Sequence, residues 1–153
     1  MNDRIEVEVG LGEGVTLPIT LPHAEAAVRH VLSAEGVQVA EISVAFVGDE
    51  EIARLNEEYL AHEGTTDVIS FALHAAGESP LGDIYVGVDQ AGRQAAEVGV
   101  PVADELFRLV IHGTLHVLGY DHPEGPDRAG SVMYRRQEEL LTGFLDRIGA
   151  QGR

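Results

Sequence analysis

The segment 102–118 constrains the fold more than any other part of this 153-residue chain. Its apolar residues lie on every side of a helix rather than along one stripe, so a helix here has to be buried. They are Leu106, Phe107, Leu109, Val110, Ile111, Leu115, Val117 and Leu118. The same segment carries His112 and His116, which are four residues apart. At about 3.6 residues per turn such positions share one face of a helix, so both imidazoles can point at a common atom.

A third histidine follows directly after the end of this helix. Gly119 can adopt the left-handed conformation that ends a helix, and His122 can then approach the same atom from the side. Buried imidazoles without partners would cost roughly 1–3 kcal/mol each, and a shared metal removes that cost. Three imidazoles leave one position of a tetrahedral zinc open, as in catalytic sites, and the chain has no cysteine to close it. We therefore predict one Zn²⁺ on His112, His116 and His122, although copper, iron or nickel also suit imidazole ligands.

The spacing also resembles the long zincin motif, with histidines at offsets zero, four and ten and a glycine at offset seven. In the proteases with this motif, a glutamate after the first histidine acts as general base. This chain has Gly113 at that position. A metal can by itself lower the pKa of its water from 15.7 to about 7, so a nucleophile remains available. The group that protonates a leaving amine is missing, which argues against a peptidase and leaves phosphodiester cleavage open.

Four sequence blocks together resemble the YbeY-type endoribonucleases, the bacterial ribosomal-RNA maturation factors. The blocks stand in the family's order and at about its spacing, so the resemblance covers residues 42–145. They are HGTLHVLGYDH at 112–122, LNEEY at 55–59, TDVISF at 66–71 and LGDI at 81–84.

This resemblance implies a small zinc-dependent hydrolase that cuts single-stranded RNA. Such an enzyme would mature the 3′ end of the small-subunit ribosomal RNA and serve ribosome quality control, with the small ribosomal subunit as partner. From the matching blocks we expect Asn56, Asp67 and Ser70 to bind substrate. A solvated helix position for Asn56 and a capping role for Asp67 are the alternatives. Residues three apart on a strand face opposite sides, so at most one of Asp67 and Ser70 should reach the cleft.

One position departs from the family pattern. Family members often carry an arginine, thought to contact the substrate phosphate, directly after the tyrosine of the LNEEY block, where this chain has Leu60. Arg54 lies six residues earlier, on another side of the predicted helix, and is no obvious substitute. The arginine's role is therefore not transferred to any residue here, and metal ligation is unaffected.

The charge is unusual for a protein that acts on RNA. The chain has 26 acidic and 10 basic residues, a formal net charge of −16, and all ten basic residues are arginine. Such a chain repels a polyanion beyond the roughly 8 Å over which salt screens charge. A local positive cleft, a basic partner that delivers the RNA, or a saline cytoplasm would each reconcile charge and substrate. Alternatively the charge reflects host composition alone.

The hydrophobic pattern predicts one α/β (α+β) domain over residues 1–153, with a mixed sheet of about four strands and helices packed on it. Strands are expected at 5–9, 42–46, 67–73 and 83–88, and helices at 23–34, 49–59, 89–98, 102–118 and 127–148. Asp49 and Asp89 are expected to cap their helices, and Tyr59 and Val132 to point inward. No apolar run reaches the length of a membrane span, and residues 1–9 do not resemble a signal peptide. We expect a cytoplasmic protein without a membrane partner.

The remaining polar candidates have less specific patterns. Asp121 either orients a ligand or accepts a proton, or it caps the turn after Gly119. The paired Arg135 and Arg136 either touch RNA or belong to a mixed, solvated helix face. The other four histidines show no ligand spacing and are expected to lie at the surface or to be hydrogen-bonded: His23, His30, His62 and His74.

Three functions are consistent with these observations. The first is the zinc-dependent endoribonuclease implied by the resemblance. The second is a zincin-type metallopeptidase, against which Gly113 argues. The third is a ribosome-assembly factor without catalysis, in which the metal only stabilises the fold.

Overall fold

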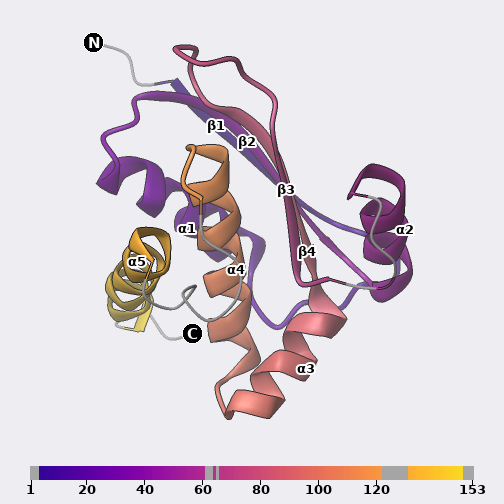
Figure 1. Ribbon diagram of the computed structural model, residues 1–153. Coiled ribbons are helices and arrows are strands. Elements are labelled where there is room, and N and C mark those ends of the chain that lie inside the picture. Colours follow the sequence, from indigo (N-terminus) through magenta and orange to yellow (C-terminus); the bar gives the residue numbers. More distant parts are fainter. Residues whose placement is uncertain (1–3, 61–63, 65, 122–130, 150–153) are drawn as a thin grey trace.

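The computed structural model describes residues 4–60, 64, 66–121 and 131–149. Four strands and five helices lie within these residues (Figure 1). In chain order they are β1 Arg4–Leu11, α1 Leu21–Ala34, β2 Val39–Val47, α2 Asp49–Leu60, β3 Val68–Ala72, β4 Leu81–Gly87, α3 Val88–Val98, α4 Val102–Val117 and α5 Val132–Gly149. The predicted α/β fold, a four-stranded sheet with packed helices, is confirmed, and each element lies within about five residues of its expected range.

The sheet has the strand order β1-β2-β4-β3. Strands β1, β2 and β4 run parallel, whereas β3 pairs antiparallel with β4 at the edge, so the expected mixed sheet is confirmed. Parallel neighbours require a crossover connection, and α1 supplies the one between β1 and β2.

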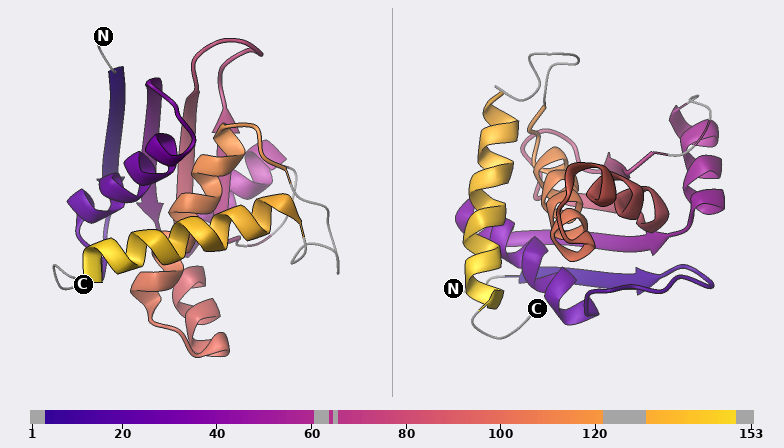
Figure 2. Two further views of the ribbon diagram at one scale, coloured as in Figure 1. Left: turned by 90° about the vertical axis from the view of Figure 1, so that its left-hand side faces the viewer. Right: turned by 90° about the horizontal axis from the view of Figure 1, so that it is seen from below.

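Helices cover the two faces of the sheet unequally. Helices α1 and α4 pack on one face, and α5 crosses them on their outer side, while α2 lies on the opposite face (Figures 1 and 2). Alternate strand residues point at the α4 face, and Ile42, Val44, Phe46, Ile84 and Val86 are at most 2% exposed there. A smaller cluster under α2 comprises Val47, Ile52, Leu55 and Ile69.

Helix α4 is the centre of the fold, as its apolar composition predicts. A Cβ atom added to Gly113 would lie 2.6 Å from Ile84 Cγ2, and one added to Gly82 would lie 2.6 Å from Val117. Contacts under 3.0 Å essentially never occur for real Cβ atoms. The two glycines therefore allow α4 to lie closer to β4 than any side chain would permit.

Two expectations about inward-facing residues are wrong. Tyr59 is 59% exposed, and Asn56 takes the inward position at 5% exposure, beside Ile52 and Leu55. The buried stripe of α2 follows the i, i+3, i+4 positions within its middle turns, and Tyr59 lies beyond it, edge-on to Phe71. Val132, at the first residue of α5, is 67% exposed because the buried face of that helix begins at Met133.

The predicted helix caps are wrong in an informative way. Asp49 is the first residue of α2 rather than its cap, and its carboxylate accepts two 2.9 Å hydrogen bonds from Arg93. Gly87 precedes α3 at the cap position, and Asp89 instead accepts the backbone N–H of Asp49 at 3.0 Å. The two acidic residues thus join the starts of α2 and α3 to each other, a long-range contact that local sequence cannot show.

No helix among the described residues is long and apolar enough to cross a bilayer.

The close contact of α4 with β4 makes a specific stability prediction. Gly113→Ala should lower the free energy of unfolding by about 1–3 kcal/mol, because the new methyl group overpacks against Ile84. Gly92→Ala is the matched control, since a Cβ at this position in α3 meets nothing within 4 Å. It should raise stability by about 0.5–1 kcal/mol through helix propensity. Urea denaturation measures both, and equal effects of the two variants would contradict the close contact.

Candidate metal centre and adjoining pocket

His112 and His116 lie side by side on the face of α4, as their spacing predicts. Their ring centroids are 4.6 Å apart and the rings are inclined at 78°. His112 is buried, at 9% exposure, and His116 is half-buried near the end of the helix. Both imidazoles are therefore close enough to bind one ion.

The turn after α4 fixes the orientation of His116. Gly119 has φ +101°, and its N–H donates to the His116 carbonyl at 3.0 Å, while the Tyr120 N–H donates to the Leu115 carbonyl at 3.0 Å. This paired 5→2 and 6→1 arrangement is a Schellman motif, for which a left-handed glycine is preferred. It places the Tyr120 carbonyl 3.0 Å from His116 Nδ1. A carbonyl only accepts, so Nδ1 carries the proton and Nε2 carries the lone pair.

Tyr120 also ties this turn to α1 and α5. Its hydroxyl donates to Glu35 Oε1 at 2.7 Å, and Arg136 Nε donates to the other oxygen of Glu35 at 2.8 Å. The pKa of Tyr120 is raised above its usual value, mainly because its hydroxyl is hydrogen-bonded to Glu35 and secondly because it is partly buried. The turn that orients His116 is thus anchored at both neighbouring helices.

Gln137 of α5 fixes the orientation of His112. The Gln137 Nε2 group donates to Glu138 Oε2 at 2.9 Å, so its Oε1 faces the imidazole, 2.6 Å from His112 Nδ1. An amide oxygen accepts, so Nδ1 of His112 also carries the proton. Both histidines therefore have the tautomer that a metal ligand binding through Nε2 requires.

The third expected ligand, His122, lies outside the described residues, as does His62. Within the described residues no group of three metal-binding side chains is found. The donor chemistry of His112 and His116 nevertheless fits a zinc ion, because neutral imidazoles with Nδ1 hydrogen-bonded to oxygen are its usual nitrogen ligands.

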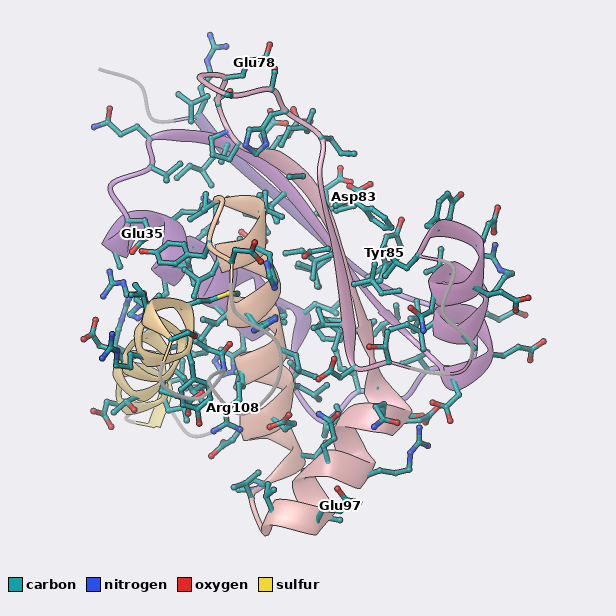
Figure 3. All side chains as sticks on the ribbon, in the orientation of Figure 1. Glu35, Glu78, Asp83, Tyr85, Glu97 and Arg108 are labelled. Atoms are coloured by element: carbon teal, nitrogen blue, oxygen red, sulfur yellow. The ribbon has the colours of Figure 1, made fainter. Side chains whose placement is uncertain are left out.

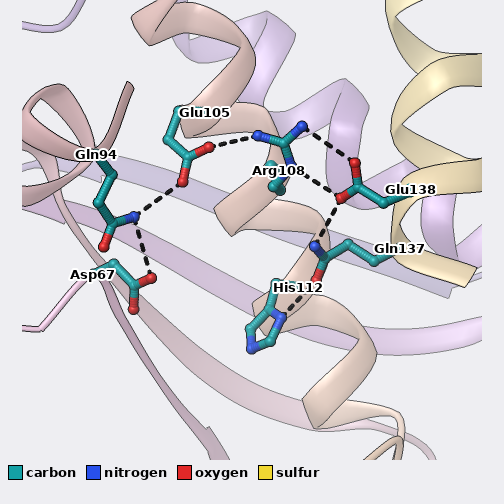
Figure 4. A network of polar contacts seen from close by, with 7 residues as sticks. All are labelled: Asp67, Gln94, Glu105, Arg108, His112, Gln137 and Glu138. Atoms are coloured by element: carbon teal, nitrogen blue, oxygen red, sulfur yellow. Dashed lines mark hydrogen bonds and ion pairs between the residues drawn. The ribbon is translucent and has the colours of Figure 1, made fainter. Parts of the chain in front are cut away.

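A chain of polar contacts leads from His112 along α4 (Figure 4). Glu138, which accepts from Gln137, also accepts from Arg108 Nε at 2.9 Å and Nη2 at 3.2 Å. Arg108 Nη1 donates to Glu105 Oε1 at 2.6 Å. Burial opposes the charge of Arg108, but the hydrogen bonds with Glu138 and Glu105 outweigh it and raise the pKa of the guanidinium.

Gln94 of α3 completes this chain at its other end. Its Nε2 group donates to Glu105 Oε2 at 3.0 Å and to Asp67 Oδ2 at 3.4 Å. The network thus connects the start of β3 with α3, α4 and α5. It runs beside a cavity of about 170 Å³, lined by Asp67, Glu105, Arg108, Leu109, His112, Met133, Tyr134 and Gln137.

The expected substrate-binding residues take three different positions. Asp67 lines the cavity together with His112. Ser70 is half-buried and pairs with Ile84 of β4, which places it on the α4 face of the sheet. The expectation that the two residues face opposite sides is wrong, because Asp67 precedes β3 and the alternation begins only at Val68, although of the two only Asp67 lines the cavity. Asn56 lies on the opposite side in α2, where its Nδ2 donates to the Gly64 carbonyl at 3.1 Å. Its burial excludes the solvated position considered as an alternative.

The sheet itself separates the two faces. Asp83 and Tyr85 point away from α4 (Figure 3). On that side Ser43 Oγ donates to Asp83 Oδ1 at 2.7 Å. Leu60, at the end of α2, is 43% exposed, and Arg54 is paired with Glu51 and Glu58 on the same helix. Neither residue lines the cavity beside His112.

The other polar candidates lie in separate places. Asp121 is exposed directly after the turn. The ring of His30 packs on Phe144, and its pKa is lowered by burial and then by Arg147. His74 Nδ1 accepts the Leu81 backbone N–H at 3.0 Å. The ring of His23 lies 6.5 Å from that of Phe107.

The sequence did not indicate the two residues that matter most around His112. Arg108 precedes His112 by four residues on the same helix face, a spacing that could have indicated it. Gln137 comes from another helix, 25 residues away, and no local pattern connects it with the histidine.

Comparisons with known proteins show the family to which the chain belongs. A family model described as Endoribonuclease YbeY matches residues 16–145. The Endoribonuclease YbeY of Geobacillus thermodenitrificans is 40% identical over 132 residues, which cover 78% of this chain and 83% of that protein. The Endoribonuclease YbeY of Chloroflexus aurantiacus is 39% identical over 146 residues, which cover 89% and 93%. A protein from Thermotoga maritima, known from its solution structure, matches with a TM-score of 0.67 and 26% identity over 97% of this chain and 93% of that one.

The network around Arg108 makes a stability prediction with a matched control. Arg108→Met should cost about 3 kcal/mol of unfolding free energy, because it leaves the nearly buried Glu105 and the Glu138 carboxylate without their cation. Arg54→Met also removes an arginine between two glutamates, but that cluster is about half exposed and its loss should matter little. Thermal and urea unfolding test the pair. Similar destabilisation by both would show that the Arg108 network is not a buried one.

Proposed function

Because this chain belongs to the endoribonuclease YbeY family and is a hydrolytic endoribonuclease, we propose that it cuts single-stranded RNA with one Zn²⁺ ion. Its substrate is the 3′ region of the small-subunit ribosomal RNA, and it acts in ribosome quality control on the small ribosomal subunit. It works in the cytoplasm as a single metal-dependent hydrolase domain over residues 1–153.

One observation carries the metal part of this proposal. On α4, both His112 and His116 direct Nδ1–H at an oxygen atom, and the two rings lie 4.6 Å apart. A hydrogen bond from Nδ1 also satisfies a buried imidazole, but on two rings that lie so close together it leaves both Nε2 atoms with a lone pair, as ligation of one cation requires. His112, His116 and His122 would hold that ion. When bound, zinc supplies Lewis-acid chemistry that polarises the phosphodiester and acidifies water.

The protein's own residues would orient and enclose the substrate. Asp67 faces the cavity beside His112, and Ser70 lies on the same side of the sheet as α4. Asn56 holds the Gly64 carbonyl, three residues before Asp67, and so positions the segment that leads to it. We assign all three to substrate binding, Asn56 through this positioning role.

Gly113 disfavours the peptidase alternative. A side chain at this position would project into Ile84 of β4, so the general base of the zincin proteases has no room there. A phosphodiester's alkoxide needs the missing proton donor less than an amine does. The geometry of α4 therefore supports phosphodiester cleavage.

Removal of one histidine tests metal and activity together. His116→Ala should lose both bound zinc, measured by elemental analysis, and cleavage of single-stranded RNA. His23 lies in α1 and packs beside Phe107, away from the candidate ligands, so His23→Ala should keep both zinc and RNA cleavage. Normal RNA cleavage by a metal-free His116→Ala protein would refute the mechanism. A variant that lacks metal and cleavage but still binds small subunits and rescues a deletion strain would indicate an assembly factor instead.

Gln137 gives a second test, of metal affinity rather than activity. Gln137→Leu should weaken zinc binding by roughly 10–100-fold, because His112 Nδ1–H loses the oxygen that orients the ring. Gln137→Glu keeps an oxygen acceptor and should bind zinc at least as tightly as the parent protein. Competition with a chromophoric chelator measures both constants. Equal affinity of the leucine variant and the parent protein would show that Gln137 has no influence on the metal.

A further inference from the structure

We infer that the cavity beside His112 is a subsite for one base of the RNA strand, and that it prefers bases with an exocyclic amino group. This inference rests on the proposed function, because it assumes an RNA substrate.

The size and the walls of the cavity suit a single flat ring system. Its volume of about 170 Å³ is well below the roughly 300–1,000 Å³ of pockets for drug-sized ligands. Leu109 and Met133 form buried apolar walls, and Tyr134 contributes an aromatic ring that is 39% exposed. Bases stack favourably on aromatic and apolar side chains, whereas a phosphate gains nothing from them.

The charges around the cavity disfavour a phosphate. Asp67 and Glu105 line it, and the only cationic side chain among its described lining residues is Arg108. Three nitrogens of Arg108 already donate to Glu105 and Glu138. With Asp67, this network therefore contains three carboxylates and one guanidinium. The carboxylates among these side chains would repel a phosphate placed here, whereas they would not repel a neutral base.

The hydrogen-bonding groups are arranged for a ligand that donates. Gln94 Nε2 bridges the Asp67 and Glu105 carboxylates at 3.4 and 3.0 Å, which holds both in place. A carboxylate only accepts and has about four lone-pair directions, so neither Gln94 on Asp67 nor Gln94 together with Arg108 on Glu105 saturates it. The amino group of cytosine is a known partner of Asp and Glu. Uracil has a carbonyl oxygen at that position, which a carboxylate repels.

The position of the cavity connects this subsite with the candidate metal centre. His112 belongs to both, so a base in the cavity brings the adjoining backbone of the strand to the imidazoles. The chain would thus hold RNA by a base at a negative site and not by a basic surface. This also explains how a chain of net charge −16 acts on a polyanion.

The test compares two short single-stranded RNAs that differ only in one cytidine or uridine at the cleaved position. We expect wild-type kcat/KM to be about tenfold higher for the cytidine substrate, from one hydrogen bond to a charged acceptor. Asp67→Asn offers an amide that both donates and accepts, so the ratio should fall to about one. Glu97→Gln removes the same charge from an exposed position of α3 and should leave the ratio unchanged.

The outcomes separate this inference from the proposed function. If the wild-type protein cuts both RNAs equally and Asp67→Asn changes nothing in the ratio, the base subsite is refuted and the endoribonuclease stands. If the wild-type protein cuts no RNA, the proposed function fails. Titration with free cytidine and uridine, followed through the Met133 methyl resonance, then decides the subsite separately. Shifts with cytidine alone support it, and no shift with either nucleoside refutes it.

Discussion

The close packing of α4 on β4 is the contact on which the rest of the structure depends. Gly113 and Gly82 lack side chains where the helix and the strand meet, and any Cβ there would lie 2.6 Å from Ile84 or Val117. Because α4 lies so near the sheet, His112 on the helix and Asp67 at the start of β3 line the same cavity. The same contact occupies the position where a zincin protease carries its catalytic glutamate. One packing requirement thus shapes both the core and the reaction that the site can support.

Around this contact, hydrogen bonds from the turn after α4 and from α5 set the orientation of the histidine side chains on α4. The Tyr120 carbonyl fixes His116 from the turn, and Gln137 fixes His112 from α5. The second of these continues through Glu138 and Arg108 towards Glu105 (Figure 4). Polar groups in such a half-buried place stabilise the fold only when each has a partner, because an unpaired one loses its hydration without compensation. The network therefore links the orientation of His112 to the stability of the fold.

Part of the negative charge of the chain lies at the cavity, where Asp67 and Glu105 line the wall. Carboxylates that would repel a phosphate are good acceptors for the amino groups of bases. The arginine that family members often carry after the LNEEY block is replaced by Leu60, which lies at the end of α2 on the opposite face of the sheet from α4. Arg108 does not substitute for it, since its donors are directed at Glu105 and Glu138. Recognition of a base rather than of the backbone is consistent with both facts.

The sequence by itself determined the mixed α/β fold, the central position of α4 and the pairing of His112 with His116, because these follow from local periodicity and from burial of apolar side chains. It also determined the left-handed backbone conformation of Gly119, since few other residues adopt that conformation without strain. Tertiary structure alone decided that Asp89 binds the Asp49 backbone, that Asn56 rather than Tyr59 points inward, and that Gln137 orients His112. Each of those contacts joins residues of different elements or depends on where a helix meets the sheet. The packing of these elements sets the distance between the residues in contact. A sequence pattern along one element carries no information about that packing.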